Sequence, residues 1–337
     1  MSWPAHWQQV TPLTRLARPL AALYGRLSAL HQRQLLRRRQ PLPVPVIVVG
    51  NIVVGGTGKT PMIGWLADWL RAQGHNPGIV SRGHGGRERG PSLVQQQDSA
   101  ARVGDEPLLL AHQTGCPVAV GRRRPEAARH LLQKHPEVDV LISDDGLQHL
   151  ALDRQCELCL FDAEAGYGNG ELIPAGPLRE PLSRLNSVDL VICKGSTRAA
   201  ASSALAPWQP LTMALQLGAL RALSPTASRP VPTPASQTEP VVALCGIGQP
   251  ESFFRLLRAE GWALEPLALS DHGVLSQRQR AALQGRTVLM TSKDAIKLQA
   301  DPLPCAAYEV PLQVQFSPLD RERLARTLQP VLNRPTA

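Results

Sequence analysis

A glycine-rich loop between an apolar strand and a helix constrains this chain more than any other feature. Residues 46–50 form an apolar run that predicts a buried strand, and residues 61–71 predict a helix. Between them lie Gly55, Gly56, Thr57, Gly58, Lys59 and Thr60. In such a P-loop, backbone N–H groups surround the phosphates of ATP, the lysine neutralises the transferring oxygens and the threonine hydroxyl ligates Mg²⁺. Val53 stands where the standard pattern has glycine, so we expect the Gly-Gly-x-Gly-Lys-Thr variant.

Two adjacent acids follow a second apolar run. Residues 138–142 predict a buried strand, and Asp144 and Asp145 come directly after it. Paired acids at a strand end often do no more than start a turn. In a chain with a P-loop, however, this is the place for the carboxylate that holds the metal, so we expect Asp144 and Asp145 to organise Mg²⁺.

Two further polar pairs could supply the base that phosphoryl transfer to an alcohol requires. Asp105 lies in the segment Gly-Asp-Glu-Pro at the start of an expected helix, where an N-cap is the simpler interpretation. His272 follows Asp271 in the later part of the chain, where such a pair is usually structural. Together they offer a carboxylate to accept the hydroxyl proton and an imidazole to orient it.

Alternating strands and helices predict an α/β protein. Apolar runs at 77–80, 118–120, 158–161 and 190–193 repeat the pattern of the P-loop strand. This order predicts a P-loop NTPase-type, doubly wound and mostly parallel sheet, with ligands beyond the carboxyl ends of the strands. We expect a basic amphipathic, membrane-docking helix at 1–42, a P-loop kinase domain at 43–200, a connector at 201–240 in which only 211–217 resembles a strand, and a smaller α/β domain at 241–330. In the smaller domain we expect strands at 241–244 and 288–291 and a helix at 251–260.

The positive charge of the chain is concentrated at its N-terminus. Seven of the 36 basic residues and none of the 27 acidic ones lie in residues 1–40, which leaves 29 basic against 27 acidic residues elsewhere. A nearly neutral body argues against a nucleic-acid partner and directs attention to the first 40 residues.

Those residues predict a basic amphipathic helix. Six leucines recur at intervals of three and four and share one face, with arginines elsewhere: Leu13, Leu16, Leu20, Leu23, Leu27 and Leu30. Pro19 should kink or divide the helix. A leucine face with arginines suits an anionic membrane surface, with Trp3, Trp7 and Tyr24 as headgroup-level anchors. Packing of the same face on the protein body is the alternative from pattern alone. No stretch approaches the ~20 apolar residues that cross a bilayer.

The sequence gives little support for a functional role of the six cysteines. Cys156 and Cys159 form a C-x-x-C, but the motif lies in an expected buried strand with no partner cluster. We therefore expect reduced thiols, as is usual in a cytoplasmic protein.

Over nearly its whole length the sequence resembles the tetraacyldisaccharide 4′-kinases, the lipid A 4′-kinases of Gram-negative bacteria. Eight ordered blocks carry the resemblance: 49–61 with the P-loop, 81–84, 104–111, 143–149, 168–181, 245–250, 271–272 and 291–295. The block at 168–181, Gly-Asn-Gly-Glu-Leu-Ile-Pro-Ala-Gly-Pro-Leu-Arg-Glu-Pro, is the most specific of them. The chain departs from the common pattern at His84, Gln249 and Ser292, which puts details of nucleotide contact in doubt rather than the reaction.

The resemblance implies transfer of the γ-phosphate of ATP to the 4′-hydroxyl of a tetraacyldisaccharide 1-phosphate at the cytoplasmic face of the inner membrane, by a peripheral or monotopic protein. It pairs Asp105 with His272 as the base system and assigns Mg²⁺ to Asp144 and Asp145. On resemblance alone, Asn169, Arg179 and Glu180 belong to the substrate-binding part of the site. Arg122, Arg123, Arg124 or Arg179 are candidates to meet the existing phosphate of the substrate, although solvated arginines are the simpler interpretation.

The acceptor also bears on the N-terminal helix. Exposing four acyl chains to water costs ~0.8 kcal/mol for each CH₂, so the reaction must take place at the bilayer and membrane docking becomes the favoured interpretation. The principal rival is a membrane-associated switch ATPase, but these proteins carry a lysine just before the double glycine, where this chain has Val54. A GTPase is disfavoured because Lys293 and Asp294 lack the Lys-x-Asp spacing of a guanine-specificity loop.

Overall fold

The computed structural model describes residues 4–195, 205–223, 231–270, 273, 275–298 and 302–333. It divides into two compact units, which we describe separately. The larger unit comprises Trp3–Asp98, Arg102–Ala214 and Val314–Ala337, and the smaller is built mainly from Leu215–Gln313. The last helix of the chain therefore groups with the P-loop unit and not with the domain expected at 241–330.

The larger unit is built on a nine-stranded sheet in the order β14-β8-β7-β6-β1-β5-β2-β4-β3. Neighbouring strands from β8 to β4 run parallel, and the edge strand β3 is antiparallel to β4. The strands are β1 (Val46–Gly50), β2 (Pro77–Ser81), β3 (Ser92–Leu93), β4 (Val118–Val120), β5 (Val140–Asp144), β6 (Cys156–Asp162), β7 (Leu190–Lys194), β8 (Leu211–Leu217) and β14 (Leu312–Phe316). The central position of β1 places the P-loop at the middle of the sheet, as expected for a doubly wound fold.

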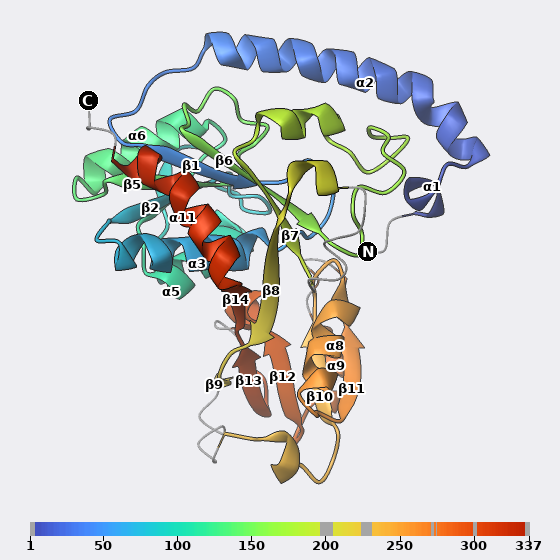
Figure 1. Ribbon diagram of the computed structural model, residues 1–337. Coiled ribbons are helices and arrows are strands. Elements are labelled where there is room, and N and C mark those ends of the chain that lie inside the picture. The colour runs from blue at the N-terminus through green and yellow to red at the C-terminus, as the bar shows by residue number, and fades with distance from the viewer. Residues whose placement is uncertain are drawn as a thin grey trace. The chain divides into compact units, whose positions relative to one another are not determined.

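Helices cover both faces of this sheet (Figure 1). They are α1 (Ala5–Gln8), α2 (Pro12–Arg37), α3 (Lys59–Ala72), α4 (Ala100–Val103), α5 (Asp105–Thr114), α6 (Arg124–Lys134) and α11 (Pro318–Leu332), with 3₁₀ turns η1 (Leu182–Ser187) and η2 (Ala206–Trp208). Side chains alternate along β1, so Val46 and Val48 join the apolar cluster that includes α6, while α3 packs on β1, β2 and β5 from the other side.

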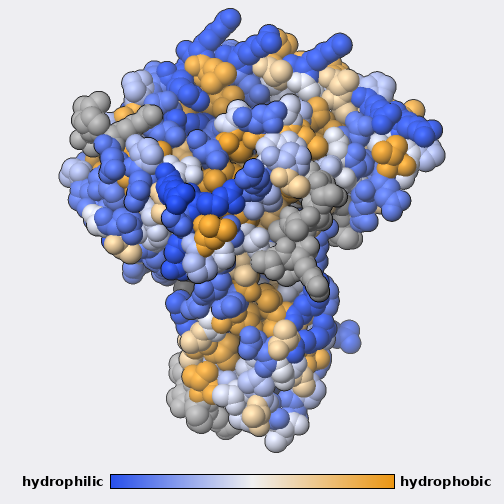
Figure 2. All heavy atoms as spheres, viewed as in Figure 1, coloured by the Kyte–Doolittle hydropathy of each residue, from blue (hydrophilic) through white to orange (hydrophobic). Residues whose placement is uncertain are grey.

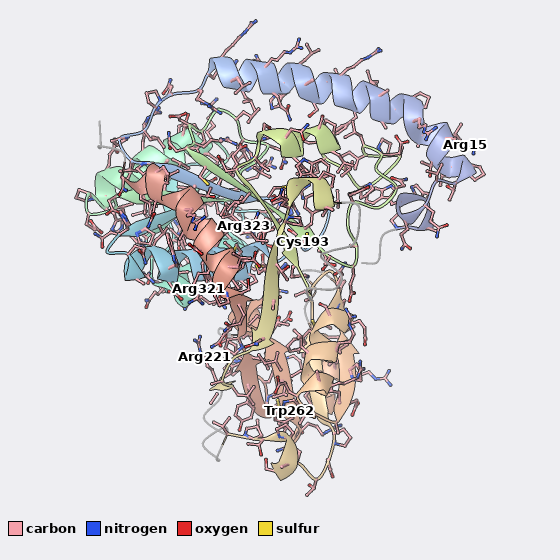
Figure 3. All side chains as sticks on the ribbon, in the orientation of Figure 1. Arg15, Cys193, Arg221, Trp262, Arg321 and Arg323 are labelled. Atoms are coloured by element: carbon pink, nitrogen blue, oxygen red, sulfur yellow. The ribbon has the colours of Figure 1, made fainter. Side chains whose placement is uncertain are left out.

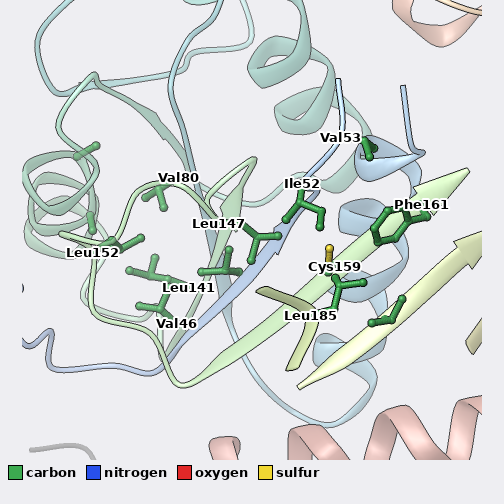
Figure 4. Close-up of a cluster of buried hydrophobic side chains, with 14 of the residues drawn as sticks. Val46, Ile52, Val53, Val80, Leu141, Leu147, Leu152, Cys159, Phe161 and Leu185 are labelled. Atoms are coloured by element: carbon green, nitrogen blue, oxygen red, sulfur yellow. The ribbon is translucent and has the colours of Figure 1, made fainter. Parts of the chain in front are cut away.

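The apolar cluster beneath α6 also supports the loops of the site (Figure 4). Leu147 lies two residues beyond Asp145 and is fully buried in this cluster together with Ile52, which follows the P-loop strand. Phe161 and Cys159 of β6 complete the cluster on the far side of β1. Close-packed protein interiors deform little. The loops that carry the polar residues of the site therefore begin at rigidly held positions.

The smaller unit has a five-stranded sheet in the order β11-β10-β12-β13-β9, parallel except for the antiparallel edge strand β9. Its elements are β9 (Arg221–Ala222), η4 (Pro234–Ser236), β10 (Val241–Cys245), α8 (Pro250–Ala259), β11 (Leu264–Ala268), α9 (Gln277–Ala282), β12 (Thr287–Thr291), α10 (Ser292–Leu298) and β13 (Ala306–Val310). Phe253, Phe254 and Trp262 are buried against β10, and Figure 3 marks Trp262 and Arg221 on this unit.

The N-terminal helix α2 turns its leucines away from the protein. Leu13, Leu16, Leu20, Leu23, Leu27 and Leu30 are between 53% and 76% exposed. The residues that contact the body are one position further on and mostly small or polar, among them Thr14, Ala21 and Tyr24. Figure 2 shows hydrophobic and hydrophilic residues interleaved over α2. The alternative that the leucines pack on the body is therefore wrong, and the helix runs unbroken through Pro19.

The cysteines agree with the expectation of reduced, structural thiols. All six are free and buried, and the C-x-x-C lies within β6. Burial raises the pKa of each thiol, to about 11 for Cys193, which keeps it in the unreactive protonated form.

Candidate active site

The P-loop joins β1 to the first turn of α3, and a buried asparagine fixes its shape. Asn51 is fully buried, and its Nδ2 donates to the Thr57 hydroxyl at 3.1 Å and to the carbonyl of Gly55 at 3.3 Å. Gly55 and Gly58 have φ values of +120° and +86°, which disfavour any residue with a Cβ. Helix α3 then starts at Lys59, so its unpaired N–H groups and its dipole are directed towards the loop and provide an anion site.

Lys59 and Arg179 both contact Asp145. Lys59 Nζ lies 3.4 Å from Asp145 Oδ1, and Arg179 Nη1 lies 3.1 Å from Oδ2. Asp145 has the left-handed φ of +47°, a conformation that turns it out of the strand direction of β5. Burial alone would raise the pKa of Asp145, but the charges of Lys59 and Arg179 outweigh it and hold this pKa well below its usual range. Asp145 is thus a permanent anion that positions two cations at the phosphate loop.

Asp144, one residue earlier, lies in the opposite electrostatic environment. It is the last residue of β5 and is 3% exposed, and one carboxylate oxygen accepts a 2.8 Å hydrogen bond from Ser81 Oγ. Burial, and then the charges of Glu106 and Asp145, raise the pKa of Asp144 to about 7. Because the ionised form of Asp144 is unfavourable in this environment, a bound cation would stabilise it.

The donors around Asp144 fit Mg²⁺. The Asp144 carboxylate and the Ser81 hydroxyl are hard oxygen donors, which this ion prefers. Among the described residues there is no cluster of three or more His, Cys, Asp or Glu side chains that could form an all-protein metal cage. Mg²⁺ is commonly held by one or two carboxylates with the remaining ligands from phosphates and water, which matches this arrangement.

Asp105 is the first residue of α5. It is 4% exposed, and its Oδ1 accepts a hydrogen bond from the backbone N–H of Glu106 at 3.1 Å. A Cβ added to Gly104, which has φ +96°, would lie 2.6 Å from the carbonyl oxygen of His84, so the loop after β2 closes tightly on the start of α5. Its predicted partner His272 lies outside the described residues.

The segment 168–181 connects the N-terminal helices to this site. The carbonyl of Arg179 accepts a 3.0 Å hydrogen bond from the Tyr24 hydroxyl, and its N–H donates to Ile52 at 2.7 Å. Glu180 is 2% exposed and accepts hydrogen bonds from Gln32 of α2 and from Gln148, which follows the paired aspartates. Arg179 and Glu180 therefore lie between α2 and the segment that carries Asp144 and Asp145.

Asn169 holds the same segment in shape. Its Nδ2 donates to the carbonyls of His6 (2.6 Å) and Ala175 (2.9 Å), and its Oδ1 accepts from the N–H of Glu171 at 3.0 Å. All of these partners are main-chain groups, so the side chain ties α1 to the turn.

We expect Asn169→Ala to lower the free energy of unfolding by about 2–3 kcal/mol, because the substitution leaves carbonyls unsatisfied in a partly buried place. Chemical denaturation measures this change. The exposed Asn76→Ala is the control, expected within about 0.5 kcal/mol of wild type. Equal stability of the two variants would contradict the anchoring role.

Several residues of the site were not predicted from the sequence. Ser81 meets Asp144 because β2 and β5 pair in parallel with Val80 opposite Ser143. Glu106 acts on Asp144 by its charge, and Asn51 fixes the P-loop. Arg124 was expected only as a candidate to meet the substrate phosphate; it is instead 1% exposed and donates to the carbonyl of Asp144 at 2.8 Å. The available indication was position: Asn51 and Ser81 both lie at the carboxyl ends of expected parallel strands, where sites of this fold collect.

A doubly wound sheet with a P-loop on its central strand, a loop lysine and strand-end carboxylates defines a P-loop enzyme that handles nucleotide phosphates. The family model described as "Tetraacyldisaccharide-1-P 4'-kinase" matches residues 13–333. The chain therefore belongs to the tetraacyldisaccharide 4′-kinase family, which confirms the resemblance.

Individual relatives agree. A tetraacyldisaccharide 4′-kinase of Alkalilimnicola ehrlichii is 46% identical over 334 residues, covering 96% of each chain. That of Azoarcus sp. is 45% identical over 332 residues, covering 97% of this chain and 95% of the relative. The crystal structure of LpxK from Aquifex aeolicus in complex with ATP superposes with a TM-score of 0.75 at 26% identity, covering 95% of this chain and 99% of that one.

Proposed function

We propose that this protein transfers the γ-phosphate of ATP to the 4′-hydroxyl of a tetraacyldisaccharide 1-phosphate in lipid A biosynthesis. The family supports the reaction, and the observation that carries it for this chain is the 3.4 Å contact between Lys59 and Asp145 beside the buried Asp144. A P-loop cation fixed next to a metal-binding carboxylate is what phosphoryl transfer requires.

In this proposal each residue of the site has a separate task. The loop Gly55, Gly56, Thr57 and Gly58 supplies N–H groups to the phosphates, and Lys59 neutralises charge on the transferring group. Thr60 and Asp144 would hold Mg²⁺, with Asp145 beside them, and the bound ion supplies further neutralisation of the phosphate oxygens. Asp145 orients Lys59 and Arg179 through its two ion pairs. Arg179 and Glu180 contribute to the binding site of the acceptor glycolipid, and Asn169 maintains the conformation of the segment 168–181 that contains them.

For the base we propose Asp105, with His272 as its partner as the family resemblance implies. Asp105 accepts the proton of the 4′-hydroxyl as the oxygen attacks the γ-phosphorus and the bond to the leaving ADP oxygen breaks. Its burial supports the assignment, because water that reached the γ-phosphate would compete with the sugar.

The direct test is transfer of ³²P from [γ-³²P]ATP into organic-extractable glycolipid by the purified full chain. Label must appear in the lipid phase and depend on Mg²⁺. Release of inorganic phosphate without labelled lipid would favour the switch ATPase and end this proposal.

We also propose that the protein works as a peripheral or monotopic protein on the anionic cytoplasmic face of the bacterial inner membrane. None of the described helices is long and apolar enough to cross a bilayer. The support is the exposed leucine row of α2, flanked by arginines such as Arg15 (Figure 3). Apolar side chains of this kind bury in the acyl boundary while arginines meet anionic headgroups.

Replacing Leu16 and Leu20 by Glu should weaken binding to anionic vesicles at least tenfold, because burying one leucine contributes about 1.5–3 kcal/mol. Vesicle co-sedimentation measures it, with thermal stability unchanged since both side chains are more than half exposed. Leu319→Glu on α11 is the matched control, because Leu319 is 67% exposed but lies outside α2. Docking by the leucine row is refuted if the double variant co-sediments like this control.

A further inference from the structure

One buried arginine holds the main chain of the loop that connects β5 to β6 and begins at Asp145. The guanidinium of Arg154 donates to four carbonyls of this loop, those of Gly146 (3.2 Å), Leu147 (3.2 Å), His149 and Leu152 (3.0 Å). Buried carbonyls need donors, and in an irregular loop a side chain can supply them. Because the donors of an arginine form a planar, rigid fork, Arg154 fixes the relative positions of the carbonyls that it binds.

Arg154 is itself fixed by a buried acid on β6. Its Nη1 lies 3.1 Å from Glu157 Oε1, and Arg184 Nη2 donates to both oxygens of the same carboxylate at 2.7 Å and 2.6 Å. The three side chains are at most 14% exposed. Buried ion pairs are often no more stabilising than apolar side chains of the same volume, whereas their hydrogen bonds define the positions of the groups.

The contacts continue from Arg184 to the segment 168–181 and return to the loop. Arg184 Nε lies 3.4 Å from Glu180 Oε2, and Glu180 Oε1 accepts a 2.5 Å hydrogen bond from Gln148 Nε2. Because Gln148 belongs to the loop that Arg154 holds, the contacts close on themselves. We call this closed set the arginine–glutamate ring, and its members are Arg154, Glu157, Arg184, Glu180 and Gln148.

The arginine–glutamate ring connects three segments of the candidate active site. Gln148 follows Asp145 in the same loop, and its Nε2 also donates at 3.0 Å to the carbonyl of Asn51, the residue that shapes the P-loop. Glu180 directly follows Arg179, the ion-pair partner of Asp145. Apolar packing holds the same parts of the chain, because side chains of the loop and of η1 are buried in one cluster, where Figure 4 labels Leu147, Leu152 and Leu185.

We infer that Arg154 and Arg184 are positioning residues for phosphoryl transfer, which hold Asp145 and Arg179 in place relative to the P-loop through the arginine–glutamate ring. The inference rests on the proposed function, because it concerns the geometry of the same site. A misplacement of about 1 Å, caused by a substitution far from the reacting atoms, can cost about 10²-fold in rate. Loss of either arginine should therefore slow the reaction, while the P-loop keeps the shape that Asn51 gives it and still binds ATP.

The first measurement is the steady-state rate of ³²P transfer into lipid by Arg154→Met and Arg184→Met. Methionine keeps an apolar side chain of similar length and removes the donors. We expect each variant to lower kcat about 10²-fold and to leave KM for ATP within about threefold of wild type. Since both arginines act through Glu157, the double variant should be within about threefold of the slower single variant, whereas independent effects would multiply to about 10⁴-fold.

Arg71→Met is the matched control, assayed like the others at a temperature at which circular dichroism shows every variant folded. Arg71 of α3 also donates to a main-chain carbonyl, that of Thr114, but it is not a member of the ring. Its replacement should leave kcat within about twofold of wild type. Arg184→Met retains the ion pair between Arg154 and Glu157, so it tests the ring even if Arg154→Met does not fold.

Hydrogen exchange tests the ring without any turnover. Arg154→Met should speed amide exchange at least about tenfold in residues 146–152 and also in residues 178–180, where the N–H groups of Leu178 and Arg179 are hydrogen-bonded. Arg71→Met should change neither segment. If Arg154→Met does not fold, Arg184→Met should speed exchange in the same two segments.

The inference is overturned if exchange increases in residues 146–152 alone, if the ring variants turn over like Arg71→Met, or if the effects of the two arginines on kcat multiply. Failure of the proposed function would look different, because the wild type would then label no lipid. The exchange rates would still decide whether the ring connects the two segments.

Discussion

Lys59→Met should lower kcat about 10³-fold while the protein remains folded. The substitution removes the P-loop ammonium that lies 3.4 Å from Asp145. Losing a single preorganised charge contact to the transferring group costs roughly 10²–10³ in rate. In the variant, Asp145 can still pair with Arg179, which lies 3.1 Å away, so we expect the loops around Asp145 to stay in place. Lipid-phase ³²P transfer gives the rate, and fluorescence titration with a nucleotide analogue gives ATP affinity separately.

Lys134→Met is the matched control, because Lys134 ends α6 and is exposed. It should retain full turnover. If Lys59→Met behaves like this control, the P-loop does not carry the reaction and the proposed function fails with it.

Asp144→Asn should abolish turnover and at the same time stabilise the fold at alkaline pH. In the wild type, burial first and then Glu106 and Asp145 raise the pKa of Asp144 from 3.8 to about 7. A raised carboxyl pKa means that the folded state binds its proton more tightly, so the stability contribution is complete below about pH 4 and is lost as pH rises through about 7. Asparagine cannot ionise, so we expect the variant to gain on the order of 2–4 kcal/mol over wild type at pH 8.

Thermal unfolding of both proteins between pH 5 and pH 8, without divalent ions, measures this difference. Adding MgATP should raise the melting temperature of the wild type and leave that of Asp144→Asn almost unchanged, because the carboxylate that would hold the ion is gone. Asp68→Asn controls for loss of a charge, since its side chain is 75% exposed. Equal gains of the two variants at pH 8 would rule out an electrostatically strained Asp144.

Much of the fold follows from periodicity and glycine placement. The expected strands at 118–120 and 211–217 coincide with β4 and β8, and the P-loop lies between its strand and helix as expected. β8, however, is paired with β7 in the large sheet, so part of the expected connector belongs to the core of the larger unit. Such strand pairings are difficult to predict from the sequence. Packing between residues far apart in the chain, rather than the local pattern, decides which strands are neighbours.

Residues of the candidate site could be predicted from the sequence only where a single local motif contains them. Lys59, Asp144 and Asp145 are read from local motifs. The ion pair of Asp145 with Arg179, however, depends on the pairing of segment 168–181 with residues 52–54, which follow β1. The opposite pKa shifts of two adjacent aspartates depend on burial and on Glu106, which the spacing of acids does not reveal. For α2, the pattern identified the row of leucines but not whether it faces the protein or the solvent. The mostly small residues one position further along the helix pack against the protein body.

The hydrogen bond from Tyr24 to the carbonyl of Arg179 connects α2 to the candidate active site, independently of the proposed membrane docking. Arg179 in turn pairs with Asp145, and Asp145 pairs with Lys59, so three contacts in series link α2 to the lysine of the P-loop. Deleting residues 1–40 should therefore disturb the ion pairs of Asp145 and lower turnover, apart from any loss of the proposed membrane docking.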